Sequence, residues 1–264
     1  MYGFVQGVGD RHNLAIVEQS LKDKVVLVTG GARRVGAAIV RKLHAAGATV
    51  VIHYHRSVVD AQALAAELNA IRPVSVTPLG GDLMNLALLR ALIEATIARF
   101  GHLDILVNNA STFYATPVGE ITEAHWNDLM GTNLRAPLFL SQAAAPHLKA
   151  RNGLILNIVD IHGMRPLRQH VVYSPAKAGL IMLTQSLARE LAPQVRVNGI
   201  APGPVEFPEQ GLSDEAKQAI IDKTLLKRRG SPDDIARAAL FFAAEAPYVT
   251  GQILAVDGGR SANT

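Results

Sequence analysis

The chain has 264 residues, of which 49% are hydrophobic and 18% are charged, values that suit one large globular domain with an aliphatic core. Cysteine is absent, which excludes disulfides and thiolate metal sites and fits a reducing compartment such as the cytoplasm; we expect no metal. The net charge of +4 is dispersed, and no apolar run approaches the ~20 residues of a membrane span, so we expect neither nucleic acid nor membrane as a partner.

Residues 1–22 lack the basic start, apolar centre and cleavage site of a signal peptide, and we interpret them as an N-terminal extension of unknown role. From Asp23 onward, short β-branched runs alternate with helical patterns. Strands are expected at 24–29, 49–54, 74–79, 104–108, 153–159, 195–200 and 252–256. Helices are expected at 35–46, 60–71, 86–100, 122–130, 134–151, 174–191 and 232–246, with one or two more within 204–231.

This alternation predicts an α/β fold, a Rossmann-type doubly wound parallel sheet of about seven strands with helices on both faces. No linker or repeat interrupts residues 23–264, so we expect a single domain. The sequence predicts Ser231 as a helix N-cap with Pro232 at the first helical position. The basic run Lys227-Arg228-Arg229 precedes Gly230, and we interpret it as a solvated helix end. Ligands of such sheets bind beyond the carboxyl ends of the strands.

A glycine-rich loop, TGGARRVG over residues 29–36, joins the first predicted strand to the first helix. Glycines there let backbone N–H groups approach a phosphate at the helix N-terminus, although a tight structural turn requires glycine as well. Arg34 stands where dinucleotide-binding loops usually have their middle glycine, and Arg33 precedes it, which indicates extra negative charge on the ligand. The candidate cofactor-binding residues of this loop are Gly30, Arg33, Arg34 and Val35.

The second predicted strand ends in HYHRS, residues 53–57, without the acid that usually binds the ribose 2′-hydroxyl of NAD. His55, Arg56 and Ser57 are donors suited to a 2′-phosphate, which favours NADPH, although a polar strand end facing water would look the same. After the third strand comes the run Gly81-Asp82-Leu83, in which Asp82 is either an acceptor for the adenine amine or a turn residue.

The fourth strand ends in small residues that permit close approach of a nicotinamide ribose, and Asn109, Ala110 and Ser111 are its candidates. Phe113 offers a flat apolar face for a substrate. Two alternatives remain open here, since Asn109 could tie strand edges together and Phe113 could belong to the core. Asn133 begins the next predicted helix.

The fifth strand ends on an acid, Asp160; Tyr173 follows thirteen residues later and Lys177 four residues after that. A phenol with a pKa near ~10 exchanges protons poorly at neutral pH, and an ammonium on the same helix face favours its ionised form. The spacing Y-x-x-x-K is common by itself. Placed after the fifth strand, with a glycine-rich loop on the first, it indicates a proton-transfer site.

These motifs resemble the short-chain dehydrogenase/reductase family over about 240 residues. The matching elements are TGxxxxxG (29–36), NNA (108–110), Asn133, YxxxK (173–177), PG (202–203) and VDGG (256–259). The family normally has a serine where this chain has Asp160. Together with Arg34, HYHRS and the NASTF run at 109–113, that substitution resembles the pteridine reductase branch.

The resemblance implies NADPH-dependent reduction of a dihydropterin, and of dihydrofolate as a further candidate, to the tetrahydro form. It implies Asp160, Tyr173, Lys177 and Asn133 as catalytic residues, and Arg34, Ser111, Phe113, Asp160 and Tyr173 as substrate-binding residues. It adds Leu83, Tyr173, Lys177, Pro202, Gly203 and Val205 to the cofactor site. It also implies a homotetramer; some relatives close the pocket with a C-terminal arginine of a neighbouring subunit, and here either Arg260 takes that place or no residue does.

Two other functions remain open. A reductase of the same family could act on another carbonyl substrate, such as a 3-ketoacyl thioester, but a carboxylate at position 160 would repel a developing oxyanion. A noncatalytic NADPH-sensing protein would need the glycine-rich loop but neither Tyr173 nor Lys177.

Overall fold

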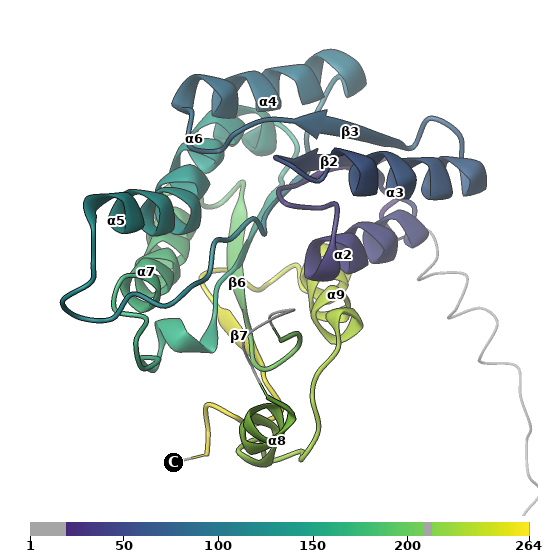
Figure 1. Cartoon of the computed structure of the whole chain (residues 1–264). Helices are drawn as coiled ribbons and strands as arrows, with labels where there is room; N and C mark the ends of the chain where they lie inside the picture. Colours follow the sequence, from purple (N-terminus) through teal and green to yellow (C-terminus); the bar gives the residue numbers. More distant parts are fainter. Residues whose placement is uncertain (1–19, 208–212, 264) are drawn as a thin grey trace, which may run out of the picture.

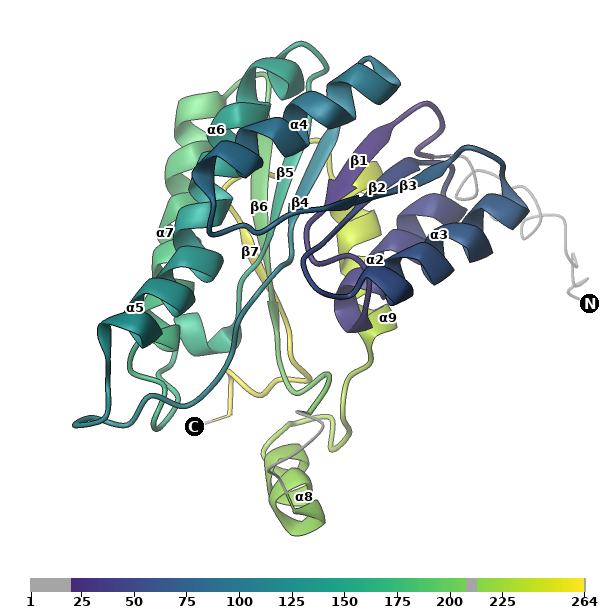
Figure 2. The same ribbon diagram turned by 45° about the horizontal axis from the view of Figure 1, so that its top comes forward.

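The computed structural model describes residues 20–207 and 213–263, and the extension expected over 1–22 lies almost wholly outside them. The described chain forms one seven-stranded sheet in the order β3-β2-β1-β4-β5-β6-β7, with every neighbouring pair parallel (Figures 1 and 2). The strands are β1 (Val25–Val28), β2 (Thr49–Tyr54), β3 (Val76–Gly80), β4 (Ile105–Asn108), β5 (Leu154–Ile158), β6 (Arg196–Pro202) and β7 (Ile253–Val256). The predicted doubly wound fold is therefore confirmed.

Helices cover both faces of the sheet. One face carries α2 (Arg34–Ala45), α3 (Val58–Ile71) and α9 (Pro232–Leu240), and the other carries α4 (Leu86–Phe100), α6 (Ala136–Lys149) and α7 (Tyr173–Leu191) (Figure 2). Each face has its own aliphatic cluster, because β-branched residues on the buried strands point alternately to the two sides. The shorter helices α5 (Glu123–Met130) and α8 (Asp214–Asp222) lie toward the carboxyl ends of the strands.

Strand order fixes where a ligand can enter. From β1 the chain moves outward through β2 to β3, returns to β4 beside β1, and then proceeds to β7. The reversal therefore lies between β1 and β4, whose chains continue into loops that lead to opposite faces, and in open parallel sheets this is where a ligand binds. The glycine-rich loop follows β1, and the loop 109–122 follows β4.

Two local structures differ from their predictions. The break expected between residues 130 and 134 is a π-helical turn, Gly131–Arg135, that joins α5 to α6 without interruption. The interpretation of Lys227-Arg228-Arg229 as a helix end is wrong, because α8 ends at Asp222 and the basic run lies in an irregular turn. The chain is drawn out of the helix there by hydrogen bonds from the Leu225 and Leu226 amides to the Gly258 carbonyl, at 2.8 and 3.1 Å.

Candidate active site

The loop between β1 and α2 is shaped for close approach of its backbone. Gly30 has φ +59°, and a Cβ on Gly36 would lie 2.2 Å from the Gly30 carbonyl oxygen, so both positions require glycine. The first amides of α2 have no partners within the helix and carry the positive end of its dipole. This end of α2 therefore has the geometry expected of an anion-binding position, and the binding of a phosphate there stays a prediction.

Arg34 adopts a left-handed backbone, with φ +54°, at the position where related loops have glycine. Its side chain crosses to the segment that follows β6, where its Nε lies 2.5 Å from Glu206 Oε2 and its Nη2 donates to the Phe207 carbonyl at 3.1 Å. Arg33 lies 3.9 Å from Asp60. Both arginines of the loop therefore lie near an acid of the chain itself, Arg34 beside Glu206 and Arg33 beside Asp60.

The carboxyl end of β2 brings donors to the same edge of the sheet. His55 and Arg56 are exposed, and Ser57 is the N-cap residue of α3, without a side-chain capping bond. No ion pair joins His55 or Arg56 to an acid in the described ranges, so both side chains can meet an incoming anion.

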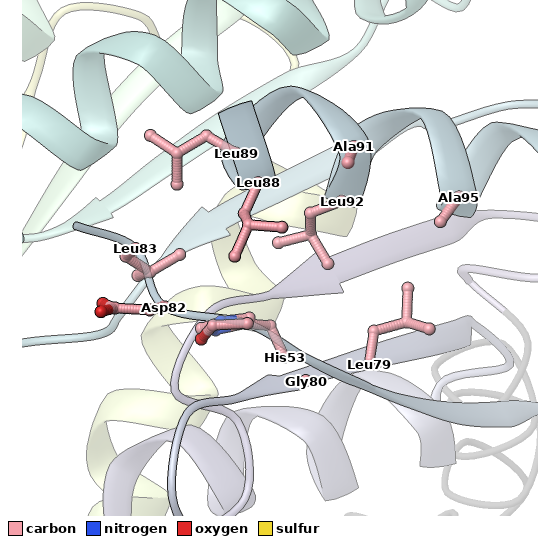
Figure 3. Close-up of a pocket in the computed structure, with 11 residues that line it drawn as sticks. His53, Leu79, Gly80, Asp82, Leu83, Leu88, Leu89, Ala91, Leu92 and Ala95 are labelled. Carbon is pink, nitrogen blue, oxygen red and sulfur yellow. The ribbon is translucent and has the colours of Figure 1, made fainter. Parts of the chain in front are cut away.

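Next to β2, the end of β3 borders a pocket of about 190 Å³ between the sheet edge and α4 (Figure 3). Leucine and alanine side chains line most of it, and Asp82 and His53 supply its polar groups. The Met84 amide donates to Asp82 Oδ1 at 2.9 Å, which is the turn role foreseen as one alternative. Within the part of the chain that the structure describes, Asp82 Oδ2 accepts no hydrogen bond, which leaves it available to a ligand.

The end of β4 is tied to β1. The side-chain Nδ2 of Asn109 donates to the carbonyls of Thr29 and Gly30, at 2.9 and 3.0 Å. The backbone amides of Asn109 and Ala110 both donate to Thr29 Oγ1. The Asn109 side chain thus ties the ends of β1 and β4 together, which is the structural role that the sequence left open for it. Ala110 lies against Gly30.

Asp160, Tyr173 and Lys177 meet beyond β5. Asp160 caps a short 3₁₀ turn and accepts the His162 amide at 2.7 Å, while its second oxygen accepts the Tyr173 hydroxyl at 2.7 Å. Tyr173 is the first residue of α7, and Lys177 lies one turn further along, where its Nζ donates to the Ile158 carbonyl at 3.0 Å. Asp160, Tyr173 and Lys177, which the sequence predicted from their placement after the fifth strand and from the family resemblance, therefore lie together in one cluster.

Burial and charge set the proton affinities of this cluster. Burial raises the pKa of Tyr173 well above its usual 10, and the Asp160 carboxylate raises it further, while the neighbouring Ser111 hydroxyl acts in the opposite direction. Burial lowers the pKa of Lys177 to about 8, against the attraction of Asp160. At neutral pH the phenol holds its proton and the lysine remains an ammonium.

Asn133 and Ser111 occupy the opposite wall. The π-helical turn directs the Asn133 side chain back to the Leu129 carbonyl, at 2.9 Å, and to the Thr112 carbonyl, at 3.0 Å. The Ser111 hydroxyl donates to Asn133 Oδ1 at 2.6 Å. π-Turns concentrate at functional sites, and this one holds a chain of polar groups from α5 to the Tyr173 region.

Phe113 does not belong to the core, because 45% of its surface is exposed. Its ring stacks on that of His170 with centroids 4.7 Å apart, and it lies nearly perpendicular to the Tyr173 ring, with centroids 4.8 Å apart. The sequence reasoning missed His170, although its place three residues before Tyr173 could have suggested it. The sequence also carries no sign that Glu206 pairs with Arg34, or that His53 bonds both Gly30 and Gly81.

The segment after β6 closes the site. The Gly203 amide donates to the Val256 carbonyl at 3.1 Å, and a Cβ on Gly203 would lie 2.6 Å from Asp257, so the Pro202-Gly203 turn is fixed against β7. Val205 is buried and Glu206 faces Arg34. In the described ranges, no group of acidic or histidine side chains is arranged to hold a metal ion. No helix in those ranges is long and apolar enough to cross a membrane.

Comparisons with known proteins agree with this geometry. A sequence model of the family described as enoyl-(acyl carrier protein) reductase matches residues 30–261. Pteridine reductase 1 of Leishmania tarentolae is 36% identical over 280 residues, covering 90% of this chain and 96% of the relative. A 3-oxoacyl-[acyl-carrier-protein] reductase of Staphylococcus aureus is 35% identical over 240 residues, covering 89% and 97%.

Solved structures show the same fold. A blue fluorescent protein from a metagenomic library, crystallised in complex with NADPH, matches with a TM-score of 0.87 and 35% identity, covering 92% of this chain and 99% of that one. A Serratia marcescens short-chain dehydrogenase/reductase double mutant matches with a TM-score of 0.87 and 32% identity over the same shares.

Proposed function

The chain belongs to the short-chain dehydrogenase/reductase family, and from that premise we propose that it is an NADPH-dependent pteridine reductase that converts a dihydropterin to its tetrahydro form. It is an oxidoreductase, and its cofactor is NADPH. The finer assignment, to a pterin, depends mainly on one observation, the hydrogen bond between Asp160 and Tyr173 at a position where the family normally has a serine.

The residues at the carboxyl edge fit NADPH. The glycine-rich loop and the start of α2 suit the pyrophosphate, and Arg56, His55 and Ser57 suit a 2′-phosphate at a strand end that has no acid. Lys177 suits the nicotinamide ribose as a buried ammonium. We assign the other cofactor contacts to the residues predicted from the sequence, namely Gly30, Arg33, Arg34, Val35, Asp82, Leu83, Asn109, Ala110, Ser111, Tyr173, Pro202, Gly203 and Val205.

The proposed reaction adds a hydride and a proton across a C=N bond of the dihydropterin ring. NADPH supplies the hydride when bound. The proton that the Tyr173 hydroxyl shares with Asp160 is the one that we assign to the ring nitrogen, and Lys177 holds its positive charge nearby. Phe113 offers a half-exposed ring on which a planar heterocycle can stack, and Ser111 and Arg34 offer donors for its edge.

Asp160 argues against a ketone as the substrate. Carbonyl reduction builds negative charge on the substrate oxygen, and a carboxylate beside it opposes that charge, whereas a basic ring nitrogen gains from an adjacent acid–phenol pair. The 35% identity to a 3-oxoacyl-[acyl-carrier-protein] reductase keeps a ketoacyl thioester as the second candidate. A noncatalytic NADPH sensor would have no use for the cluster of Asp160 with the buried side chains of Tyr173 and Lys177.

A substrate panel tests the proposal. NADPH oxidation is measured with dihydrobiopterin, dihydromonapterin, dihydrofolate and a 3-ketoacyl thioester, using wild-type protein and Tyr173→Phe. We expect turnover of at least one dihydropterin, with kcat reduced about 10²–10⁴-fold in the variant. Turnover of the ketoacyl thioester alone would favour the second candidate. Tight NADPH binding without turnover of any of the four compounds would favour the sensor.

We also propose a homotetramer assembled through α6 and α7. Leu138 on α6 and Met182 on α7 are large apolar side chains with 37% and 61% of their surface exposed in the isolated chain, which suits a helix-to-helix contact between subunits. Light scattering of the purified protein measures the number of subunits directly. The cytoplasmic location stays a prediction.

A further inference from the structure

His53 is a buried imidazole at the carboxyl end of β2, with 1% of its surface exposed. Its Nδ1 lies 3.3 Å from the Gly30 amide nitrogen, and its Nε2 lies 3.0 Å from the Gly81 carbonyl oxygen. Gly30 belongs to the glycine-rich loop, and Gly81 directly precedes Asp82 at the end of β3. One ring therefore joins two loops that lie on either side of the β2 end, and Figure 3 shows it beside Asp82 at the pocket.

These two contacts allow only one protonation state. A backbone amide can only donate, so Nδ1 must carry a lone pair; a carbonyl can only accept, so Nε2 must carry the hydrogen. His53 is thus a neutral imidazole in the Nε2–H form. Burial lowers the pKa of His53 to about 4, in agreement with this state.

The same residue also takes the next amide of the loop, because the Gly31 N–H donates to the His53 backbone carbonyl at 3.0 Å. The amides of Gly30 and Gly31 are therefore committed to residue 53 and cannot face a phosphate. The expectation that the N–H groups of these two glycines meet the phosphate is thus wrong, and Gly30 stays a candidate for cofactor contact only through its Cα. That leaves the amides at the start of α2 for this task. The position of the loop relative to β2, and hence of those amides, depends on His53.

His53 also fixes the adenosine side. Gly81 is held twice, since its carbonyl accepts from His53 Nε2 and its amide donates to the Tyr54 carbonyl at 2.9 Å. Arg56, the candidate for a 2′-phosphate, lies three residues beyond His53 on the same chain. His53 therefore links three parts of the proposed cofactor site: the glycine-rich loop, the segment around Gly81 and the donors for the 2′-phosphate.

We propose that His53, locked as the neutral Nε2–H tautomer, is a positioning residue for the dinucleotide cofactor. It sets the spacing between the glycine-rich loop and Gly81 and touches neither the reacting atoms nor the substrate. The inference rests on the proposed dinucleotide site but does not depend on which substrate is reduced.

Three substitutions separate the two bonds. In His53→Asn the amide oxygen occupies the place of Nδ1 and keeps the bond to Gly30, whereas in His53→Gln the amide nitrogen occupies the place of Nε2 and keeps the bond to Gly81. His53→Leu keeps neither. The matched control is His44→Leu, because His44 is also buried and hydrogen-bonded, to Ser75 at 2.8 Å, but lies at the opposite end of the sheet.

We expect His53→Leu to weaken NADPH and NADH alike, by about tenfold or more, with kcat at saturating NADPH within about twofold of wild type. His53→Asn and His53→Gln should fall between wild type and His53→Leu. Dissociation constants are measured by titration, and melting temperatures are recorded in parallel. The control should lose thermal stability without losing cofactor affinity.

Nitrogen NMR supplies a readout that does not depend on the cofactor. At neutral pH, His53 should show an unprotonated Nδ1 resonating far downfield of a protonated Nε2. A cationic ring or the Nδ1–H tautomer would overturn the proposal, and so would a His53→Leu variant that loses stability like the control yet binds NADPH normally. If the wild-type protein bound no dinucleotide at all, the proposed function would fail even with the tautomer as expected, so the two failures are distinguishable.

Discussion

Asp160 and Tyr173, thirteen residues apart in the chain, are joined by a hydrogen bond of 2.7 Å at the point where β5 ends and α7 begins. The Asp160 charge raises the pKa of Tyr173 and also raises that of Lys177, because a nearby anion disfavours a phenolate and favours an ammonium. Burial has the larger effect on both groups, so the Asp160 charge adds to the raised pKa of Tyr173 and only partly offsets the lowered pKa of Lys177.

The first prediction concerns Asp160→Asn and the pH profile. Lys177 is charged below its pKa of about 8, so activity that needs the ammonium is lost as the pH rises through that value. Without the Asp160 charge the pKa of Lys177 falls, and the alkaline limb of kcat/KM should move to lower pH. The measurement is the pH dependence of kcat/KM, which reports the free enzyme. An alkaline limb that stays in place would show that Asp160 does not govern Lys177.

Asp160→Ser restores the hydroxyl that the family normally has at this position. We expect it to lower kcat/KM for a dihydropterin by at least about tenfold while leaving the NADPH dissociation constant within about twofold, because Asp160 touches Tyr173 and not the phosphate-binding edge. Steady-state kinetics and NADPH titration on one preparation check this. Equal losses of both quantities would mean that Asp160 supports the structure of the whole site.

Arg56→Ala tests the assignment of the 2′-phosphate. A charge-assisted hydrogen bond contributes about 1.5–3 kcal/mol, so NADPH should bind roughly 10- to 100-fold more weakly while NADH, which has no 2′-phosphate, changes little. This selective loss contrasts with the parallel loss expected for His53→Leu. The ratio of the two dissociation constants is the measurement, and equal weakening of both cofactors would contradict the assignment.

The sequence predicts those features that depend on neighbours along the chain. The bounds of β2 and α4 match their predictions, because a β-branched run ends at Tyr54 and a helical pattern ends before Gly101. Tyr173 and Lys177 share a helix whose period places them together. Contacts between distant segments could not be read in this way. Arg34 and Glu206 are 172 residues apart, and the turn at Lys227 depends on bonds to Gly258. Tertiary contacts override local pattern at both places.

Glu206→Gln tests what the ion pair with Arg34 does. The Glu206 carboxylate pairs with the Arg34 guanidinium beside the glycine-rich loop, so an incoming anion must compete with it for Arg34. Both side chains are partly exposed, at 46% and 26%, so the pair contributes at most about 1 kcal/mol. We therefore expect NADPH to bind about two- to fivefold more tightly in the variant.

The chain offers a matched control for that measurement. Arg41 lies on the same helix as Arg34, and Glu67→Gln removes its partner, which lies 2.6 Å away, is more exposed than Glu206 (46% against 26%) and is not part of the loop. It should leave NADPH binding unchanged. Weaker binding in Glu206→Gln would indicate that the Arg34–Glu206 pair holds the cofactor in place rather than competing with it.

Asp104 gives a prediction for stability alone. This buried carboxylate precedes β4, where it accepts the Val25 amide at 2.9 Å and lies 3.1 Å from both Lys24 Nζ and Arg151 Nε. In Asp104→Asn these two cations lose their anionic partner, but each side chain is 40% exposed and can rehydrate. We therefore expect the free energy of unfolding to fall by about 2–4 kcal/mol, near the lower end for a broken buried pair. Such a loss lowers the melting temperature by roughly 5–15 °C for a domain of this size. Because Asp104 lies at the amino ends of the strands, opposite the site, kcat and both KM values should stay at wild-type levels below the transition, and a change in any of them would mean that the two ends of the sheet are coupled.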